Sequence, residues 1–389
     1  MKKKNLLLAV VLLFGILIQH ANAQTKSSTT SGSNVVTTGV PFLTIAPDSR
    51  SGAMGDAGVA ISPDVNSQAW NPAKYAFVES EMGVALSYTP WLRNLVKDIN
   101  LAYLVGYKRL DDQNTVSASL RYFSLGDITF MSDIGAELGN QSPNEFALDM
   151  AYTRLLTDKF SGAVALRYIR SDLTGGQSVN GVETHAGSTF ATDVAFYYQN
   201  QIRVNRKMST ISAGINISNI GGKISYTDGA TKDFLPANMK LGVAYKTEMD
   251  KYNTITIAFD ANKLLVPTPN KRDTVDIITG VGSSKSVVAG IFSSFGDAPG
   301  GAKEEFKEIT FSLGAEYWYN KQFALRAGYF YEDASKGNRK FFTAGAGLKM
   351  NVFALDFSYL LPVAQNNPLA NTLRFTLSFD LDAFNKQRK

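Results

Sequence analysis

The sequence contains no cysteine, only two histidines and a single long apolar run. Without cysteine, the chain can form neither a disulfide scaffold nor a lipoprotein anchor. His20 follows the apolar run at the N-terminus, and His185 lies in a glycine-rich stretch, so a histidine-based metal cluster is excluded. We therefore predict no catalytic residues, no metal site and no cofactor, and we do not expect an enzyme.

The N-terminus has the pattern of a secretory signal peptide. Lysines occupy positions 2–4, an uncharged apolar run covers 6–18, and Ala21-Asn22-Ala23 supplies a small-x-small cleavage site. The run is too short for a membrane-spanning helix. We predict a signal peptide over 1–23, followed by a flexible tail over 24–39 that is rich in serine and threonine.

The charge of the remaining chain is close to balance. Residues 1–23 hold three of the 39 Lys and Arg residues and none of the 34 Asp and Glu residues, which leaves 36 basic residues against 34 acidic ones. The basic isoelectric point therefore belongs largely to the signal peptide. Nothing in this balance indicates a nucleic-acid partner.

From residue 81 onward, segments of about ten residues alternate between apolar and polar side chains, which is typical of β-strands. Their length suits a tilted crossing of a bilayer, and their even number is required of a single-chain bacterial barrel. We predict a fourteen-stranded antiparallel transmembrane β-barrel over 81–381 and a C-terminal tail over 382–389. The predicted strands are 82–89, 99–108, 115–123, 145–155, 159–170, 188–198, 209–218, 238–246, 252–260, 307–319, 321–332, 340–350, 351–361 and 370–381.

The connections between these segments alternate between short and long, with more than forty residues after the ninth strand and only Asn320 after the tenth. Outer-membrane barrels show this alternation when both barrel termini lie in the periplasm and the long loops face outward. A soluble β-sandwich, the alternative, would have to cover fourteen apolar strand faces with protein. Tyrosines at the strand ends predict two aromatic girdles: Tyr88, Tyr122, Tyr168, Tyr331 and Tyr359 at one, and Tyr107, Tyr152, Tyr198, Tyr245 and Tyr319 at the other.

The stretch over 51–77 is rich in small residues and does not alternate. A barrel of fourteen strands is wide enough to leave a lumen, so we predict that 40–80 forms a hatch inside it. Ser62-Pro63 has the pattern of a helix start. The alternative is that these residues merely lead into the first strand from the periplasmic side. Inward-facing charges of both signs are expected to pair with one another and with the hatch.

The motif "RSGAMGDAGVA" followed by "WNPA" resembles the N-terminal hatch of the FadL-like outer-membrane transporters, with Met54, Gly55, Asn71, Pro72 and Ala73 among the matching residues. The phrases "DANKLLVPTP" (260–269) and "DAPGGAKEEFKEI" (297–309) resemble the PorV branch of that family, which belongs to the type IX secretion machinery of Bacteroidetes. The resemblance runs from about residue 39 to the C-terminus. It implies an outer-membrane location in a Gram-negative cell.

This resemblance implies a non-enzymatic role in protein transport. Members of the branch bind the C-terminal signal domain of secreted cargo and pass it from the translocon barrel to a peptidase-like protein of the surface attachment complex. The lipid bilayer is a further expected partner, and lipopolysaccharide is a candidate. We predict that the long loop over 261–306 binds cargo through its apolar residues: Leu264, Leu265, Val266, Ile291 and Phe292.

Two other functions stay open at this point. A FadL-like transporter of hydrophobic small molecules across the outer membrane would need an apolar pocket at the hatch and a gap between strands. A surface hydrolase acting on lipid is disfavoured, because His185 is the only histidine outside the N-terminal region and no nucleophile elbow is present.

Overall fold

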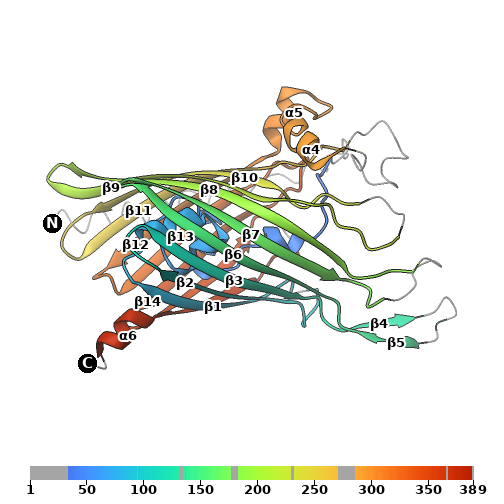
Figure 1. The fold of residues 1–389 in the computed structure, drawn as a ribbon, viewed down its shortest axis with the longest axis horizontal. Helices are drawn as coiled ribbons and strands as arrows, with labels where there is room; N and C mark the ends of the chain where they lie inside the picture. The colour runs from blue at the N-terminus through green and yellow to red at the C-terminus, as the bar shows by residue number, and fades with distance from the viewer. Residues whose placement is uncertain are drawn as a thin grey trace. The chain divides into compact units, whose positions relative to one another are not determined.

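Fourteen antiparallel strands close into a barrel in the computed structural model of the chain (Figure 1). The structure describes residues 34–93, 95–131, 135, 137–176, 183–228, 232–269, 285–364 and 367–387, so the predicted signal peptide and most of the predicted tail lie outside the described residues. The barrel strands are β1 (Met82–Pro90), β2 (Asn100–Arg109), β3 (Asn114–Ser124), β6 (Asn144–Thr157), β7 (Phe160–Asp172), β8 (Gly187–Val204), β9 (Lys207–Gly221), β10 (Asn238–Glu248), β11 (Asn253–Leu264), β12 (Ile309–Tyr319), β13 (Phe323–Tyr331), β14 (Lys340–Lys349), β15 (Phe353–Pro362) and β16 (Leu373–Asp380).

Each barrel strand pairs with its neighbours in the barrel order, and β1 closes the ring against β16 from Gly83↔Asp380 to Tyr88↔Phe375. Along each strand, buried and more exposed residues alternate, as in the pattern of β3. The buried positions face inward and carry small or charged side chains, and also large apolar ones, such as Leu101 and Ile169, where the N-terminal residues pack on the wall; many of the exposed positions carry large apolar side chains. The predicted fourteen-stranded antiparallel barrel is therefore confirmed.

The two ends of the barrel differ in their connections. The turns after β2, β6, β8, β10, β12 and β14 hold two to four residues, and we call their side the short-turn end. The opposite side, the long-loop end, carries the hairpin of β4 (Ile128–Met131) and β5 (Glu137–Gln141), as well as α4 (Val287–Ser293) and α5 (Ala302–Lys307). In Figure 1 the C-terminal helix α6 (Leu381–Gln387) lies away from α4 and α5, beyond the end of β16.

Two turns are longer than predicted from the sequence. The connection after β12 is not Asn320 alone but spans 320–322, and the one after β14 spans 350–352. Asn320 and Lys321 both adopt positive φ angles, 53° and 55°. A tight hairpin turn of this kind needs two residues in the left-handed region, so one residue could not connect the strands.

Nine of the ten tyrosines predicted for the girdles lie on outward faces of the strands, but Tyr107 does not. It is buried on the inward face of β2, and its ring stacks on that of Tyr75 with centroids 5.1 Å apart. This inner face is apolar because the N-terminal segment packs on it, and alternation alone could not distinguish it from a lipid-facing one.

Residues 34–81, which we call the N-terminal segment, contain four short helices: η1 (Pro41–Thr44), α2 (Ser49–Gly52), η2 (Val65–Ala69) and η3 (Pro72–Phe77). The helix expected at Ser62-Pro63 begins instead at Val65, with Asp64 as its N-cap. Both the carbonyl and the hydroxyl of Ser62 accept hydrogen bonds from Arg50, so Ser62 does not cap a helix.

The N-terminal segment runs from the long-loop end to the short-turn end. At its start, the amide of Asn34 donates to the carbonyl of Ser335 in the connection between β13 and β14 (3.0 Å). At its end, the amide of Glu81 donates to the Asp382 carboxylate, directly after β16 (3.2 Å). The start of the segment therefore lies at the long-loop end and its end at the short-turn end.

The core of the described part lies between the N-terminal segment and the inner wall of the barrel. Near the long-loop end, Val40, Phe42 and Leu43 pack against buried strand residues such as Leu101 and Ile169. Near the other end, Tyr75 and Val78 pack against Tyr107. No helix within the described ranges is long and apolar enough to cross a membrane.

Candidate functional site at the long-loop end

The predicted hatch residues Met54 and Gly55 lie in direct backbone contact with the wall. Gly55 has a φ angle of 68°, and a Cβ atom there would lie 2.6 Å from the amide nitrogen of Tyr329. A Cβ atom at Gly314 would lie 2.6 Å from that of Met54, and one at Gly328 would overlap the backbone of Met54 and Gly55. The motif and the two strand glycines therefore form one close contact that larger residues would prevent.

Asn71, Pro72 and Ala73 fix the second half of the segment. The Asn71 side chain accepts from the amide of Ala73 at 3.0 Å and so caps η3, and its amide group donates to the carbonyl of Phe196 at 3.0 Å. The carbonyls of Pro72 and Ala73 accept from the hydroxyls of Thr153 (2.9 Å) and Ser161 (2.6 Å). All five hatch residues thus hold the segment to the wall and expose no binding surface.

Charged side chains in the lumen pair with one another. Glu316 on β12 accepts from Arg50 of the segment at 2.8 and 2.9 Å and from Arg326 on β13 at 2.7 Å. Arg326 also donates to Asp356 at 2.6 Å. These ion pairs are buried, so removing one partner would leave an uncompensated charge. The lumen is therefore organised as a structural core.

At the long-loop end, a cluster of ion pairs holds α5 to the barrel. The Nζ atom of Lys263 donates to Glu305 at 2.7 Å and to Glu308 at 2.8 Å. Lys336 donates to Glu308 at 2.9 Å and to Glu304 at 2.8 Å. We call these five residues the long-loop ion cluster. It joins the end of β11, α5 and the connection between β13 and β14.

The start of the N-terminal segment joins the same cluster. The side-chain amide of Asn34 donates to Glu304 at 2.9 Å. Burial alone would raise the pKa of Glu304, but the hydrogen bonds from Lys336 and Asn34 outweigh it and lower the pKa to about 2. Glu304 is therefore ionised throughout the physiological range and couples the segment to the loop.

The five predicted cargo-binding residues separate into two groups. Leu265 and Val266 are only 2 % exposed each and, with the partly buried Leu264, form the base of the loop directly after β11. Ile291 and Phe292 lie on α4, where Phe292 is 74 % exposed. Cargo binding by these residues stays a prediction, and α4 is the part of the set that offers an accessible surface.

The loop carries further exposed apolar residues that were not predicted from the sequence. Val288 lies on α4 one turn before Phe292, Phe295 follows α4, and Phe306 lies on α5. Ser286, whose hydroxyl caps α4 by accepting from the amide of Ala289, followed by the run "VVAGIF" is a helix-start signal that could have revealed α4.

His185 lies in an exposed connection, with its Nε2 atom 3.4 Å from the Asp228 carboxylate. Across the residues that the structure describes, no group of three or more histidine or acidic side chains is placed to hold a metal ion. Neither observation identifies a reaction centre at this end.

The family model described as "Type IX secretion system protein PorV" matches residues 28–271 of this chain, more than half of its length. A search of curated proteins returns no match. Among solved structures, the toluene transporter TodX of Pseudomonas putida is similar at 11 % identity, with 90 % of this chain and 98 % of that chain covered and a TM-score of 0.49. A FadL homologue of Pseudomonas aeruginosa is similar at 10 % identity, with 90 % and 100 % covered and a TM-score of 0.43.

Proposed function

This chain belongs to the family of type IX secretion system protein PorV and is an outer-membrane β-barrel of that system, and on this premise we propose that it carries cargo proteins. In this proposal the long-loop end binds the C-terminal signal domain of a secreted protein. The barrel receives the cargo from the translocon and delivers it to the peptidase-like protein of the attachment complex. The chain has no catalytic part in this transfer.

The observation that carries the proposal is the contrast between a filled lumen and an exposed apolar surface. The N-terminal segment occupies the inside of the barrel, which leaves the long-loop end as the place for a folded cargo to bind. There, Val288 and Phe292 on α4 are 63 % and 74 % exposed. Clustered exposed apolar side chains on an otherwise polar rim are typical of a protein-binding surface.

Substitutions on α4 test the cargo-binding role. The double variant Val288→Asp, Phe292→Asp should capture a purified cargo signal domain at least tenfold less well than the wild type, with both barrels solubilised in detergent. The reason is that a charge in an apolar contact removes a hot spot worth about 2 kcal/mol of binding free energy. Leu95→Asp, at a 65 % exposed apolar residue in the connection between β1 and β2, is the matched control. Equal capture by the two variants would refute the assignment of α4.

The proposal also sets the orientation, with the long-loop end at the cell surface and the short-turn end in the periplasm. A protease site inserted directly before Asn34 tests it, because Asn34 is bonded to Ser335 and Glu304 at the long-loop end. We expect added protease to cut this site in intact cells, whereas a site in the turn at 205–206 should be cut only in permeabilised cells. The reverse pattern would contradict the orientation.

Transport of hydrophobic small molecules remains the alternative function. It requires a path past the N-terminal segment, which Arg50, Asn71 and the contact at Gly328 hold to the wall. Uptake of a labelled fatty acid by cells that express the protein, compared with cells that lack it, would favour the alternative, particularly if the α4 variants secreted cargo normally.

A further inference from the structure

An apolar pocket of about 410 Å³ lies on the outer side of the barrel wall, between β10–β12 and the loop that carries α4 and α5. Its floor comes from residues on the outward faces of three adjacent strands. Met239, Lys263 and Ile309 form one row across them, and Leu241 and Ala261 belong to the next row. The residue before Ala261, Asp260, points to the inside of the barrel, because its carboxylate accepts hydrogen bonds from the amides of Gly58 and Val59 in the N-terminal segment.

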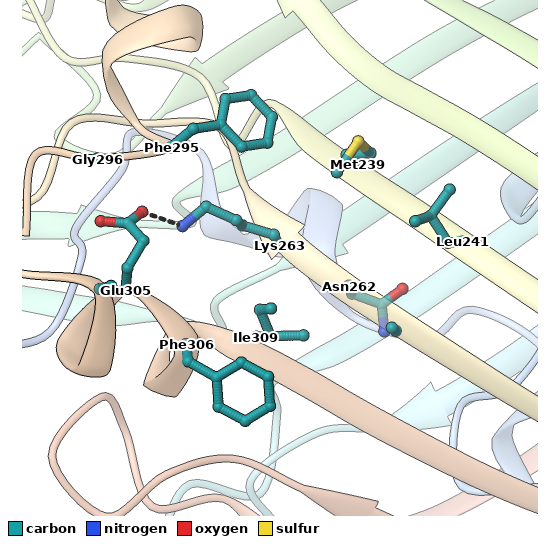
Figure 2. A pocket seen from close by; sticks show the side chains of 11 residues that line it. Met239, Leu241, Asn262, Lys263, Phe295, Gly296, Glu305, Phe306 and Ile309 are labelled. Carbon is teal, nitrogen blue, oxygen red and sulfur yellow. Dashed lines mark hydrogen bonds and ion pairs between the residues drawn. The ribbon is translucent and has the colours of Figure 1, made fainter.

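The roof of the pocket comes from the long loop. Figure 2 shows Phe295 and Phe306 on either side of the opening and Met239 and Leu241 across from them. At the closed side, Lys263 faces Glu305 (Figure 2), and their ion pair of 2.7 Å neutralises a cation that would otherwise stand on the outward face of β11. A charge on a lipid-facing strand is costly, so this pairing marks the upper limit of the hydrocarbon region.

The pocket is continuous with the lipid-facing surface below it. The ring of Phe306 lies 6.0 Å from that of Phe311, which stacks at 5.9 Å on Phe259, the outward residue two positions before Ala261. Further along β10, Leu241 and Val243 are exposed on the same face. The open side of the pocket therefore faces the hydrocarbon of the surrounding bilayer and not the aqueous phase.

The size and the lining of the pocket select its occupant. The lining is apolar except for Asn262, Lys263 and Glu305. The volume lies in the range of about 300–1,000 Å³ that is usual for sites of small ligands. A slender apolar chain fits both the volume and the lining.

We propose that this pocket binds one acyl chain of a bilayer lipid, with the α4–α5 loop closing over it. The lipid would hold α4 and α5 against the outer wall from the membrane side, as the long-loop ion cluster holds them from the polar side. This site differs from the lumen and from the exposed face of α4, and it does not depend on the proposed role in cargo transfer.

The test counts lipids that stay bound to the full-length protein. The protein is reconstituted in nanodiscs of 1-palmitoyl-2-oleoyl phosphatidylethanolamine, extracted again in mild detergent, washed and weighed by native mass spectrometry. We expect one retained lipid for the wild type. Ala261→Trp, which fills the pocket, should reduce retention at least tenfold, whereas Val243→Trp, on the same outward face but outside the pocket, should leave it unchanged.

A second variant separates loss of the site from loss of the fold. Phe306→Ala removes a ring from the roof and changes no strand residue, and it should also lower lipid retention. For each variant, the migration of the unboiled protein on a gel reports whether the barrel is intact. The proposal is overturned if the wild type retains no lipid. It is equally overturned if Ala261→Trp, with its barrel intact, retains as much lipid as Val243→Trp.

Discussion

The N-terminal segment and the α4–α5 loop are the two largest regions outside the barrel strands, and they are held in different ways. The segment lies against the inner wall through buried backbone contacts, as at Gly328, and through fully enclosed ion pairs, as between Arg50 and Glu316. The loop lies against the outer wall through the long-loop ion cluster, whose side chains are 4–21 % exposed, and it leaves Phe292 in the open.

This difference separates a structural element from a binding one. Close-packed contacts that exclude water hold a region in one position. Its polar groups are hydrogen-bonded to the wall, and its side chains fill the available space. Exposed aromatic rings, such as that of Phe292, gain free energy only when a partner covers them. We therefore propose that the segment closes the lumen and that the loop recognises cargo.

The largest effect is expected from removing a charge that holds the segment. Glu316→Gln leaves Arg50 and Arg326 without their shared carboxylate, which should lower the free energy of unfolding by about 3–5 kcal/mol. Urea unfolding in lipid vesicles measures it. Asp112→Asn, at a fully exposed carboxylate 3.8 Å from Arg109, is the control and should leave the free energy of unfolding unchanged. Similar effects of the two variants would show that the carboxylate of Glu316 does not hold the segment in place.

A smaller effect is expected from added volume at the contact of the segment. Gly328→Val places side-chain atoms where the backbone of Met54 and Gly55 lies, and overpacking of this kind costs about 1–3 kcal/mol. The displaced segment should raise ion conductance in planar bilayers. Gly296→Val, at a glycine with no atom within 4 Å of an added Cβ, should leave conductance unchanged. Equal ion conductance of the Gly328→Val variant and the wild type would show that the segment does not close the lumen.

The smallest effect concerns the loop and depends on pH. The pKa of Glu304 is lowered to about 2 from an ordinary value near 4.5, so its contribution to holding α5 is complete above pH 4.5 and is lost as the pH falls through 2. Pepsin cleavage within α5, normalised to cleavage in the β4–β5 hairpin, should accelerate between pH 4 and pH 2. In Glu304→Gln it should already be fast at pH 4. A variant that behaves like the wild type would contradict the role of Glu304.

The barrel could be predicted from the sequence because its pattern is local. Alternation within each strand and the contrast between the short turn after β6 and the long loop after β11 indicate the number of strands and the order of connections without knowledge of distant contacts. The hatch motif was also visible, since Gly55 and Asn71 have roles that few other residues can fill. The cargo-binding set was less complete, because burial of Leu265 and Val266 depends on how the loop folds back.

The remaining features depend on contacts between residues far apart in the chain. Asn34 and Glu304 are separated by 270 positions, and nothing near Asn34 indicates that the segment begins at the long-loop end. Tyr107 matches the girdle pattern by its place near a strand end, yet it lies on the inward face of β2, where its ring stacks on Tyr75. The pocket combines two rows of strand residues with a loop roof, so no single stretch of sequence encodes it.

A reversible disulfide between the segment and the barrel wall tests the central claim. This claim is that the segment stays in the lumen while cargo binds at the long-loop end. The hydroxyl oxygens of Ser49 and Thr376 lie 3.2 Å apart, and the native chain has no cysteine, so Ser49→Cys with Thr376→Cys can form one defined disulfide. The account predicts that cargo reaches the cell surface equally well with the disulfide oxidised or reduced. Secretion that stops on oxidation and returns on reduction would contradict it.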